Sequence, residues 1–290
     1  MFLPKRVLKE KMRRFLEEDI GQGDVTTWLI IPEDVLVEAE VIVKENGIVA
    51  GIEETLALCE SLDLQAKALV SDGAHVKSKA SILCLTGDAR TVLSAERTLL
   101  NVLSRMSGIA TMTNRLVRKI RAANPKIHIS CTRKVAPGLS YFDKKAVFFG
   151  GGDTHRLHLD DLVLIKDNHL KIVGSIDEAV RKTRESASFS KKIEVEVADA
   201  QDAVKAAKAG VDIIMLDNLY PTKVKETVSL LTNERLRKQI LLEVSGRISE
   251  KNILEYATTD VDIISVGEIT HSAKALDMSL EIVKIRKTKK

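Results

Sequence analysis

Positively charged side chains occur in three short polar segments of the chain, each of which follows a run of aliphatic residues. The first segment holds Arg133 and Lys134, the second holds Arg156, and the third begins with Lys166. A guanidinium group binds a carboxylate or a phosphate through two parallel hydrogen bonds, whereas an ammonium group acts as a compact positive charge. If these segments lie together in the folded chain, they form a binding site for a substrate with several negative charges.

Acidic residues and glycines follow the later aliphatic runs. Glu196 and Asp217 offer carboxylate oxygens, which Mg²⁺ prefers as ligands, and substrate phosphates often complete such a magnesium site. The last two runs are followed by Ser245-Gly246 and by Gly267, and glycine allows backbone N–H groups to approach a phosphate closely. The sequence therefore predicts one pocket that binds a polyanion, a metal ion and a phosphate group.

Each of these features also has an ordinary structural explanation. A single arginine or lysine after a strand is most often a solvated loop residue, and a single carboxylate is most often a cap or a surface charge. The glycine triplet at residues 150–152 also fits a flexible loop. The occurrence of cations after three successive strands favours a functional anion site over surface decoration.

The arrangement of the aliphatic runs predicts a β/α barrel from about residue 126 onward. Each run is followed by a polar turn and a helical stretch, which is typical of a parallel sheet. Six or seven such units can close or nearly close into a barrel with functional residues at the carboxyl ends of its strands, although periodicity alone also allows an open sheet. The runs cover residues 127–130, 162–165, 193–197, 213–216, 240–244 and 263–266, with a further strand expected near Val147.

The chain up to about residue 112 has a different, mixed α and β pattern. Residues 4–18 have the pattern of a charged amphipathic helix, and Val35–Val43 alternates apolar and polar residues with the period of a half-buried strand. Further helices are expected at residues 52–62 and 91–106, and further strands at residues 66–70 and 81–85.

Composition argues against several classes of protein. The 45 basic and 41 acidic residues nearly balance and aromatic residues make up 3% of the chain, which does not favour nucleic-acid binding. No apolar run approaches the roughly 20 residues that cross a bilayer, so no membrane association is expected. Neither a G-x-G-x-x-G sequence after the first strand nor a P-loop sequence occurs, so nucleotide-binding folds of those kinds lose their main support.

The cysteines favour a reducing compartment. Cys59, Cys84 and Cys131 show no metal-binding spacing, and one of them stays unpaired in any disulfide scheme. The sequence also has no apolar region typical of a signal peptide. We therefore expect a cytoplasmic protein.

Eight sequence motifs, in the same order along the chain, closely resemble the quinolinate phosphoribosyltransferase family, also called nicotinate-nucleotide pyrophosphorylase (carboxylating). The resemblance covers nearly the whole chain, and its most specific part lies between residues 132 and 169. One departure is Arg247, which follows Ser245-Gly246 where the family pattern has a second glycine. The motifs lie at residues 18–27, 96–101 with 107–111, 132–138, 150–156, 164–169, 216–218, 243–246 and 265–272.

The resemblance implies an α/β fold with two domains, of the type II phosphoribosyltransferase kind. Residues 1–112 would form an amino-terminal α/β sandwich, and residues 113–270 an open β/α barrel. Residues 271–290 would form a carboxyl-terminal helix that packs back on the first domain. It also implies a homodimer in which each active site is shared between the subunits, and it leaves further assembly open.

The resemblance also implies roles for individual residues. Arg97 would reach into the neighbouring subunit and bind the dicarboxylate and phosphates together with Arg133, Lys134, His155, Arg156 and Lys166. Glu196 and Asp217 would contact the ribose and Mg²⁺, directly or through substrate or water. The 5′-phosphate would be bound by Ser245, Gly246, Gly267 and His271. The catalytic set would be Lys134, Lys166, Glu196 and Asp217, with no side chain named as a general base.

The activity implied is the conversion of quinolinate and phosphoribosyl pyrophosphate to nicotinate mononucleotide, pyrophosphate and carbon dioxide in NAD biosynthesis. The alternatives are a nicotinate phosphoribosyltransferase and a non-catalytic relative of the same fold. The full cation set favours a diacid over a monoacid, and the intact Glu196, Asp217 and His155-Arg156 favour an enzyme. A barrel aldolase or isomerase would need a Schiff-base lysine, for which Lys166 is placed, or a clear acid–base pair.

Overall fold

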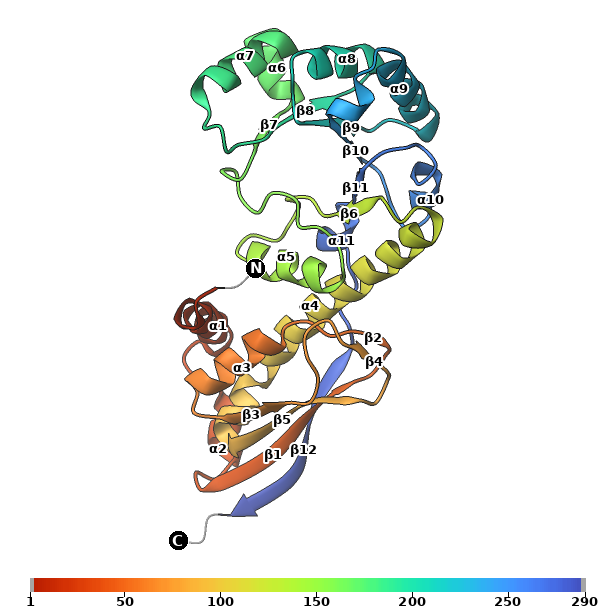
Figure 1. Cartoon of the computed structure of the whole chain (residues 1–290). Coiled ribbons are helices and arrows are strands. Elements are labelled where there is room, and N and C mark those ends of the chain that lie inside the picture. The colour runs from red at the N-terminus through yellow and green to blue at the C-terminus, as the bar shows by residue number, and fades with distance from the viewer. Residues whose placement is uncertain (1–2, 288–290) are drawn as a thin grey trace. The chain divides into compact units, whose positions relative to one another are not determined.

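The computed structural model describes residues 3–287, and the chain divides into two compact α/β units. The amino-terminal unit takes in the chain as far as Met112, the short segment Phe148–Gly150 and the carboxyl-terminal segment from Ala273. The barrel unit comprises Thr113–Val147 and Gly151–Ser272. Figure 1 labels the elements of both units along the chain.

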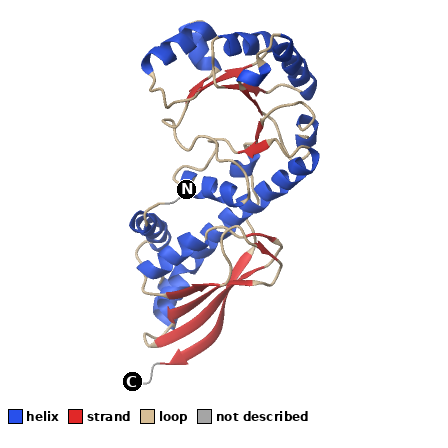
Figure 2. Ribbon diagram, in the orientation of Figure 1, coloured by secondary structure: helices blue, strands red, loops and turns tan. Residues whose placement is uncertain are grey.

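The amino-terminal unit is built on an antiparallel sheet with helices packed on it (Figure 2). The sheet has the strand order β12-β1-β5-β3, and its central strand β1 buries every second residue from Val37 to Val43, as the alternating sequence predicts. The elements are α1 (Lys5–Ile20), α2 (Val25–Ile30), β1 (Val35–Val43), β2 (Gly47–Ile48), α3 (Ile52–Ser61), β3 (Gln65–Ala68), β4 (His75–Val76) and β5 (Ser81–Asp88).

The long helix α4 (Ala89–Ala123) begins in this unit and continues into the barrel unit. The sequence pattern predicts only its first half, residues 91–106. The helix continues because the apolar stripe does: Ile109, Leu116 and Ile120 are buried.

The carboxyl-terminal segment is a strand, so the predicted helix over residues 271–290 is wrong for the part that the structure describes. Strand β12 (Met278–Lys287) pairs antiparallel with β1 along its whole length, from Val43 opposite Met278 to Val35 opposite Lys287. The β-branched residues Ile282, Val283 and Ile285 favour an extended chain. The edge of β1 that does not pair with β5 offers free backbone N–H and C=O groups, and β12 forms hydrogen bonds with them.

The barrel unit holds a parallel sheet of six strands in the order β6-β11-β10-β9-β8-β7. Within the described residues β6 and β7 do not pair, so the barrel is open between them. The strands are β6 (His128–Ser130), β7 (Val163–Ile165), β8 (Ile193–Val197), β9 (Ile213–Asp217), β10 (Leu241–Ser245) and β11 (Ile263–Ser265).

Helices follow the strands on the outside of this sheet, as Figures 1 and 2 show for α6 to α9. The core between the sheet and the helices is aliphatic; for example, Val195, Ile214 and Leu242 are fully buried. The helices are α5 (Ser140–Phe149), α6 (Asp167–Val173), α7 (Ile176–Ser186), α8 (Ala200–Lys208), α9 (Pro221–Asn233), the 3₁₀ turn η1 (Arg237–Gln239), α10 (Ile253–Tyr256) and α11 (Glu268–His271).

The strand expected near Val147 is wrong, because this residue lies in helix α5. Phe142, Ala146 and Val147 form the buried side of that helix, and a short apolar run does not distinguish a strand from a buried helix by periodicity. The edge of the sheet beside β6 is instead extended by a single residue, Asp153, which forms an isolated parallel bridge with Ser130.

No helix of the described part of the chain combines the length and the apolar character needed to cross a membrane.

Candidate functional site

A cavity of about 540 Å³ lies at the carboxyl ends of the barrel strands, and we call it the strand-end cavity. Parallel pairing places the ends of neighbouring strands side by side: Asp217 on β9 is the register partner of Ser245 on β10. Most of the residues predicted from the sequence line it together. They are Arg133, Lys134, His155, Arg156, Lys166, Glu196, Asp217, Ser245 and Gly246.

The cations in the cavity lie close enough to influence one another. Burial lowers the pKa of Arg156, and the positive charge of Arg133 lowers it further. Lys166 after β7 donates to the Glu196 carboxylate on β8 over 2.7 Å. Two guanidinium groups that repel each other favour a bound anion between them, because the anion offsets the repulsion of both.

The carboxylates of Glu196 and Asp217 lie on neighbouring strands. Burial raises the pKa of Asp217, and the negative charge of Glu196 raises it further. A hard divalent cation would relieve this repulsion, and carboxylate oxygens are suitable ligands for it. The donor set therefore fits Mg²⁺, with substrate oxygens or water completing the coordination.

The turns after β10 and β9 are packed against each other. Gly246 has φ +91°, and a Cβ atom there would lie 2.4 Å from the Asn218 Oδ1 and 2.8 Å from the Asn218 backbone nitrogen. The Asn218 N–H donates to the Ser245 carbonyl over 2.8 Å. Only glycine fits this position, so the cavity wall here is exposed backbone.

The predicted phosphate residues of β11 lie beside the cavity. A Cβ atom on Gly267 would be 3.3 Å from both the His271 Nε2 and the Lys134 Cδ, so this glycine separates the two side chains. The Thr270 hydroxyl donates to the Lys134 carbonyl over 2.8 Å and ties α11 to the segment after β6. Gly267 and His271 do not line the strand-end cavity themselves.

His155, in the wall of the cavity, belongs to a cluster that the sequence pattern does not reveal. Its Nε2 is 3.1 Å from an oxygen of Glu243 on β10 and 3.4 Å from an oxygen of Glu194 on β8. Both carboxylates are fully buried. Burial lowers the pKa of His155, whereas the adjacent Glu194 and Glu243 carboxylates raise it. The signal in the sequence is a charged residue inside each aliphatic run.

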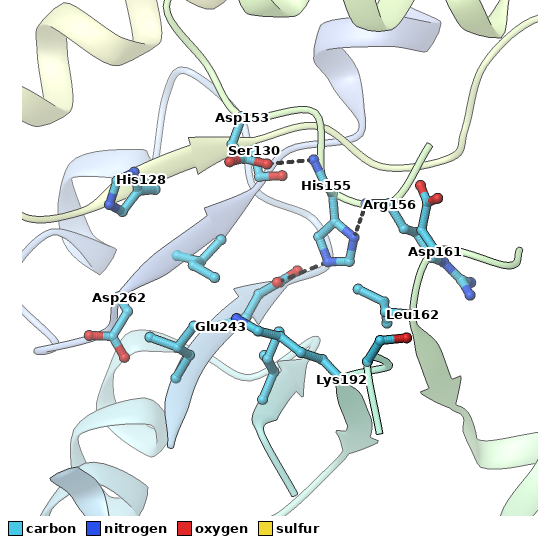
Figure 3. A pocket seen from close by; sticks show the side chains of 14 residues that line it. His128, Ser130, Asp153, His155, Arg156, Asp161, Leu162, Lys192, Glu243 and Asp262 are labelled. Atoms are coloured by element: carbon cyan, nitrogen blue, oxygen red, sulfur yellow. Dashed lines mark hydrogen bonds and ion pairs between the residues drawn. The ribbon is translucent and has the colours of Figure 1, made fainter. Parts of the chain in front are cut away.

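Figure 3 shows the His155 ring pointing toward Glu243, with Arg156 beside it. The view is into a second cavity of about 580 Å³, which we call the lower cavity. Its lining includes residues from the amino ends of the strands, such as His128 and Leu241. His155, Arg156 and Glu243 line both cavities and therefore stand between them.

Two further arginines, Arg97 and Arg247, are exposed to solvent. Arg97 is exposed on α4 and belongs to the amino-terminal unit. Arg247 is exposed, has φ +52° and does line that cavity, at the position where the sequence departs from the family pattern.

Comparison with known proteins gives the same family along the chain. Residues 24–107 match the N-terminal domain of quinolinate phosphoribosyl transferase, and residues 109–281 match its C-terminal domain. The chain is 48% identical over 275 residues to the probable nicotinate-nucleotide pyrophosphorylase (carboxylating) of Methanocaldococcus jannaschii, covering 94% of this chain and 96% of that protein.

Two further relatives agree. The nicotinate-nucleotide pyrophosphorylase (carboxylating) of Mycobacterium leprae is 37% identical over 281 residues, covering 94% of this chain and 96% of that protein. The solved structure of the nicotinate-nucleotide pyrophosphorylase from Francisella tularensis has a TM-score of 0.89 and 39% identity, covering 97% of this chain and 98% of that one.

Proposed function

The chain belongs to the quinolinate phosphoribosyltransferase family, and from this premise we propose that the strand-end cavity is its active site. The enzyme converts quinolinate and phosphoribosyl pyrophosphate to nicotinate mononucleotide, pyrophosphate and carbon dioxide, a step of NAD biosynthesis. The observation that carries the proposal is the gathering of Arg133, Arg156 and Lys166 in one cavity with Glu196 and Asp217.

Quinolinate is assigned to the cationic part of this cavity. A pyridine with two carboxylates needs at least two positive partners, which Arg133, Arg156 and Lys166 supply. We also assign a role to the partner's Arg97, as the family resemblance implies, because Arg97 is exposed and belongs to the amino-terminal unit rather than to the barrel unit. The functional unit is accordingly a homodimer with shared active sites.

Phosphoribosyl pyrophosphate is assigned to the opposite part of the cavity. Glu196 and Asp217 bind the ribose hydroxyls and Mg²⁺, and Ser245 and the Gly246 backbone accept the 5′-phosphate. Gly267 and His271, which lie beside the cavity, complete this phosphate site. Mg²⁺, when bound, supplies positive charge that neutralises the pyrophosphate group. Lys134 lies next to Gly267 and adds a cation on the same side.

The reaction requires positioning and charge compensation more than proton transfer. The pyridine nitrogen attacks C1 of the ribose, the N–C1 bond forms, and the C1–O bond to pyrophosphate breaks. Lys134 and Lys166 compensate charge on the departing group. The positive ring nitrogen then stabilises the carbanion left when the adjacent carboxylate leaves as carbon dioxide, and that carbon takes up a proton from solvent. No side chain is assigned as general base.

We also propose a cytoplasmic location. Cys59, Cys84 and Cys131 are all free thiols, and free thiols persist in reducing compartments.

The test is an assay of purified protein with quinolinate, phosphoribosyl pyrophosphate and Mg²⁺, with nicotinate in a parallel reaction. We expect nicotinate mononucleotide and carbon dioxide from quinolinate alone. Arg133→Ala should raise the KM for quinolinate more than tenfold, about the effect of losing a charge-assisted bidentate pair, with little change in Tm. Arg181→Ala is the matched control, because Arg181 is exposed on α7 and its partners in the described part of the chain are Glu178 and Glu185.

Two results would contradict the proposal. Product from nicotinate alone would assign the chain to a nicotinate phosphoribosyltransferase, and no product from either acid would favour a non-catalytic relative.

A further inference from the structure

We propose that His155, held by Glu194 and Glu243, is a positioning residue that fixes Arg156 in the active site and does not bind substrate through its ring nitrogens. The inference rests on the proposed function, because Arg156 is assigned to quinolinate there. It changes the role that the sequence predicts for His155, which is direct substrate binding.

Both nitrogens of the His155 ring are already used inside the protein (Figure 3). Nε2 faces the Glu243 and Glu194 carboxylates at 3.1 and 3.4 Å. Nδ1 accepts the Arg156 backbone N–H over 2.8 Å, which places the ring proton on Nε2 in this arrangement. A substrate carboxylate therefore finds no free N–H on this ring.

The His155 ring connects the loop that holds His155 and Arg156 to the barrel strands. Glu194 lies on β8 and Glu243 on β10, so the ring fastens the loop to two separate strands. Since the Arg156 N–H is bound to this ring, the direction in which the Arg156 side chain leaves the backbone is fixed as well. The guanidinium group then enters the strand-end cavity from a rigid base.

The preceding loop is held equally firmly. A Cβ on Gly152 would lie 2.7 Å from the Thr113 Cγ2, so this residue packs tightly against α4. The buried Lys144 donates to the Thr154 carbonyl. The His155 N–H donates to the Asp153 carboxylate over 2.6 Å, at a left-handed backbone angle of φ +51°. Such a conformation persists only where surrounding contacts impose it.

The burial of Glu194 and Glu243 has a cost in free energy that nearby cations must offset. Glu194 has two oxygens and Glu243 has one that are buried without a hydrogen-bond partner among the described residues. Burying carboxylates in this way is unfavourable unless cations compensate them. The Arg156 guanidinium is close enough to lower the pKa of Glu194, although burial raises that pKa more strongly. Glu194 thus attracts both the ring and the side chain that we propose the ring positions.

The same three side chains also have the composition of a metal site, since their ligand atoms lie within 4.8 Å of one another. A histidine that binds a metal through one nitrogen usually donates the N–H of the other. Here Nδ1 accepts a hydrogen bond instead. The geometry therefore favours a hydrogen-bonded cluster over a metal centre.

The experiment is a double-mutant cycle on the KM values for quinolinate and phosphoribosyl pyrophosphate. His155→Asn is the chosen substitution, because asparagine tolerates the left-handed conformation but is too short to reach Glu243. We expect His155→Asn and Arg156→Ala each to raise the KM for quinolinate about tenfold, and the double variant to differ less than twofold from Arg156→Ala alone. The KM for phosphoribosyl pyrophosphate should stay within about twofold in all three.

Glu243→Ala and Glu243→Gln extend the test. The alanine variant should behave as His155→Asn, and the glutamine variant should recover most of the quinolinate affinity because its amide oxygen still accepts from Nε2. Glu226→Gln is the matched control, since among the described residues the ion pair of Glu226 is with the exposed Lys223 on α9. If Glu243→Ala fails to fold, the cycle with His155→Asn still decides.

Several outcomes would overturn the inference. Full additivity of His155→Asn and Arg156→Ala would mean that His155 contacts quinolinate itself. An unchanged KM for quinolinate in Arg156→Ala would show that Arg156 does not bind this substrate, so that His155 has nothing to position. A lowered Tm in His155→Asn with no selective change in KM would show that the cluster only stabilises the fold. A stoichiometric metal ion in the wild-type protein that is lost in His155→Asn would show that the cluster is a metal site. Wild-type protein that does not turn over quinolinate would instead contradict the proposed function.

Discussion

Individual residues of the site are largely predictable from sequence where chemistry requires a particular side chain. The cations and carboxylates after the strands are identified by type, because parallel strands bring their carboxyl ends together. The cluster of Glu194 and Glu243 with His155 is not predictable in this way, since His155 follows no regular strand. Only the folded chain brings the three residues together. The interpretation of the glycine triplet as a flexible loop is wrong for Gly152, which close packing requires.

Gly246 provides a prediction about the phosphate side of the cavity. Gly246→Ala should destabilise the protein by about 2 kcal/mol, since an L residue at positive φ costs roughly 1 kcal/mol and the new Cβ must displace Asn218. The KM for phosphoribosyl pyrophosphate should rise several-fold. Gly210→Ala is the matched control: Gly210 has φ +79° and no atom within 4 Å of the position that a Cβ would take, so it reports the backbone cost alone. Equal effects of the two substitutions in urea unfolding and in KM would contradict this account.

Asp217 provides a prediction about pH and stability. Its pKa is raised in the folded state by burial and by Glu196, so ionisation of Asp217 favours unfolding. This penalty is fully present above the raised pKa and vanishes below the ordinary value of 3.8, where both states are protonated. Asp217→Asn should therefore raise the Tm of the ligand-free protein at pH 7 by about one to three degrees while abolishing activity.

The measurement for Asp217 is thermal unfolding at several pH values without substrate or Mg²⁺. The gain in Tm should shrink as the pH falls toward 4. A lower Tm for Asp217→Asn at pH 7 would show that the ionised carboxylate stabilises the folded chain, which is the opposite of the expected effect.

Elements are predicted well where a periodic pattern extends over several residues. The alternation in Val35–Val43 and the aliphatic runs at 193–197 and 213–216 correspond to β1, β8 and β9. The errors at Val147 and at the carboxyl terminus share a cause, because both depend on partners that are distant in sequence. An apolar stretch becomes a helix or a strand according to what it packs against, and β12 is a strand because β1 offers an edge.

Helix capping provides a prediction at this scale. The Ser175 hydroxyl accepts the Glu178 N–H over 3.2 Å and caps the start of α7. Ser175→Ala should lower the free energy of unfolding by about 1 kcal/mol, the usual cost of losing such a cap. The control is Ser229→Ala on α9, which removes the same hydroxyl from an exposed position inside a helix. Urea unfolding measures both, and an unchanged midpoint for Ser175→Ala would show that tertiary packing alone defines the start of α7.

At the scale of the whole molecule, the sequence order of the chain conceals how its units are assembled. The amino-terminal unit contains residues from three separate parts of the chain, and the barrel unit lies between them in sequence. Composition and periodicity indicate an α/β protein with a barrel-like second half, but they do not show that the last strand returns to the first sheet. The family motifs carry that information only in part, because they imply a segment that returns to the first domain as a helix, whereas β12 returns as a strand.

The shared active site makes the final prediction, which concerns two chains rather than one. If the partner's Arg97 completes the cavity, Arg97→Ala and Arg133→Ala should each be nearly inactive alone when quinolinate is kept well below the wild-type KM. Mixed after subunit exchange, about half of the dimers contain one chain of each kind, and one of their two sites has both arginines, so activity should return to about one quarter of wild type. Mixing Arg133→Ala with Lys166→Ala is the control, because both changes lie in the same barrel and both sites of the mixed dimer stay damaged. Native mass spectrometry of the mixture, with one variant isotopically labelled, confirms that exchange took place. If exchange is complete and activity does not return, Arg97 acts within its own chain or has no part in the reaction.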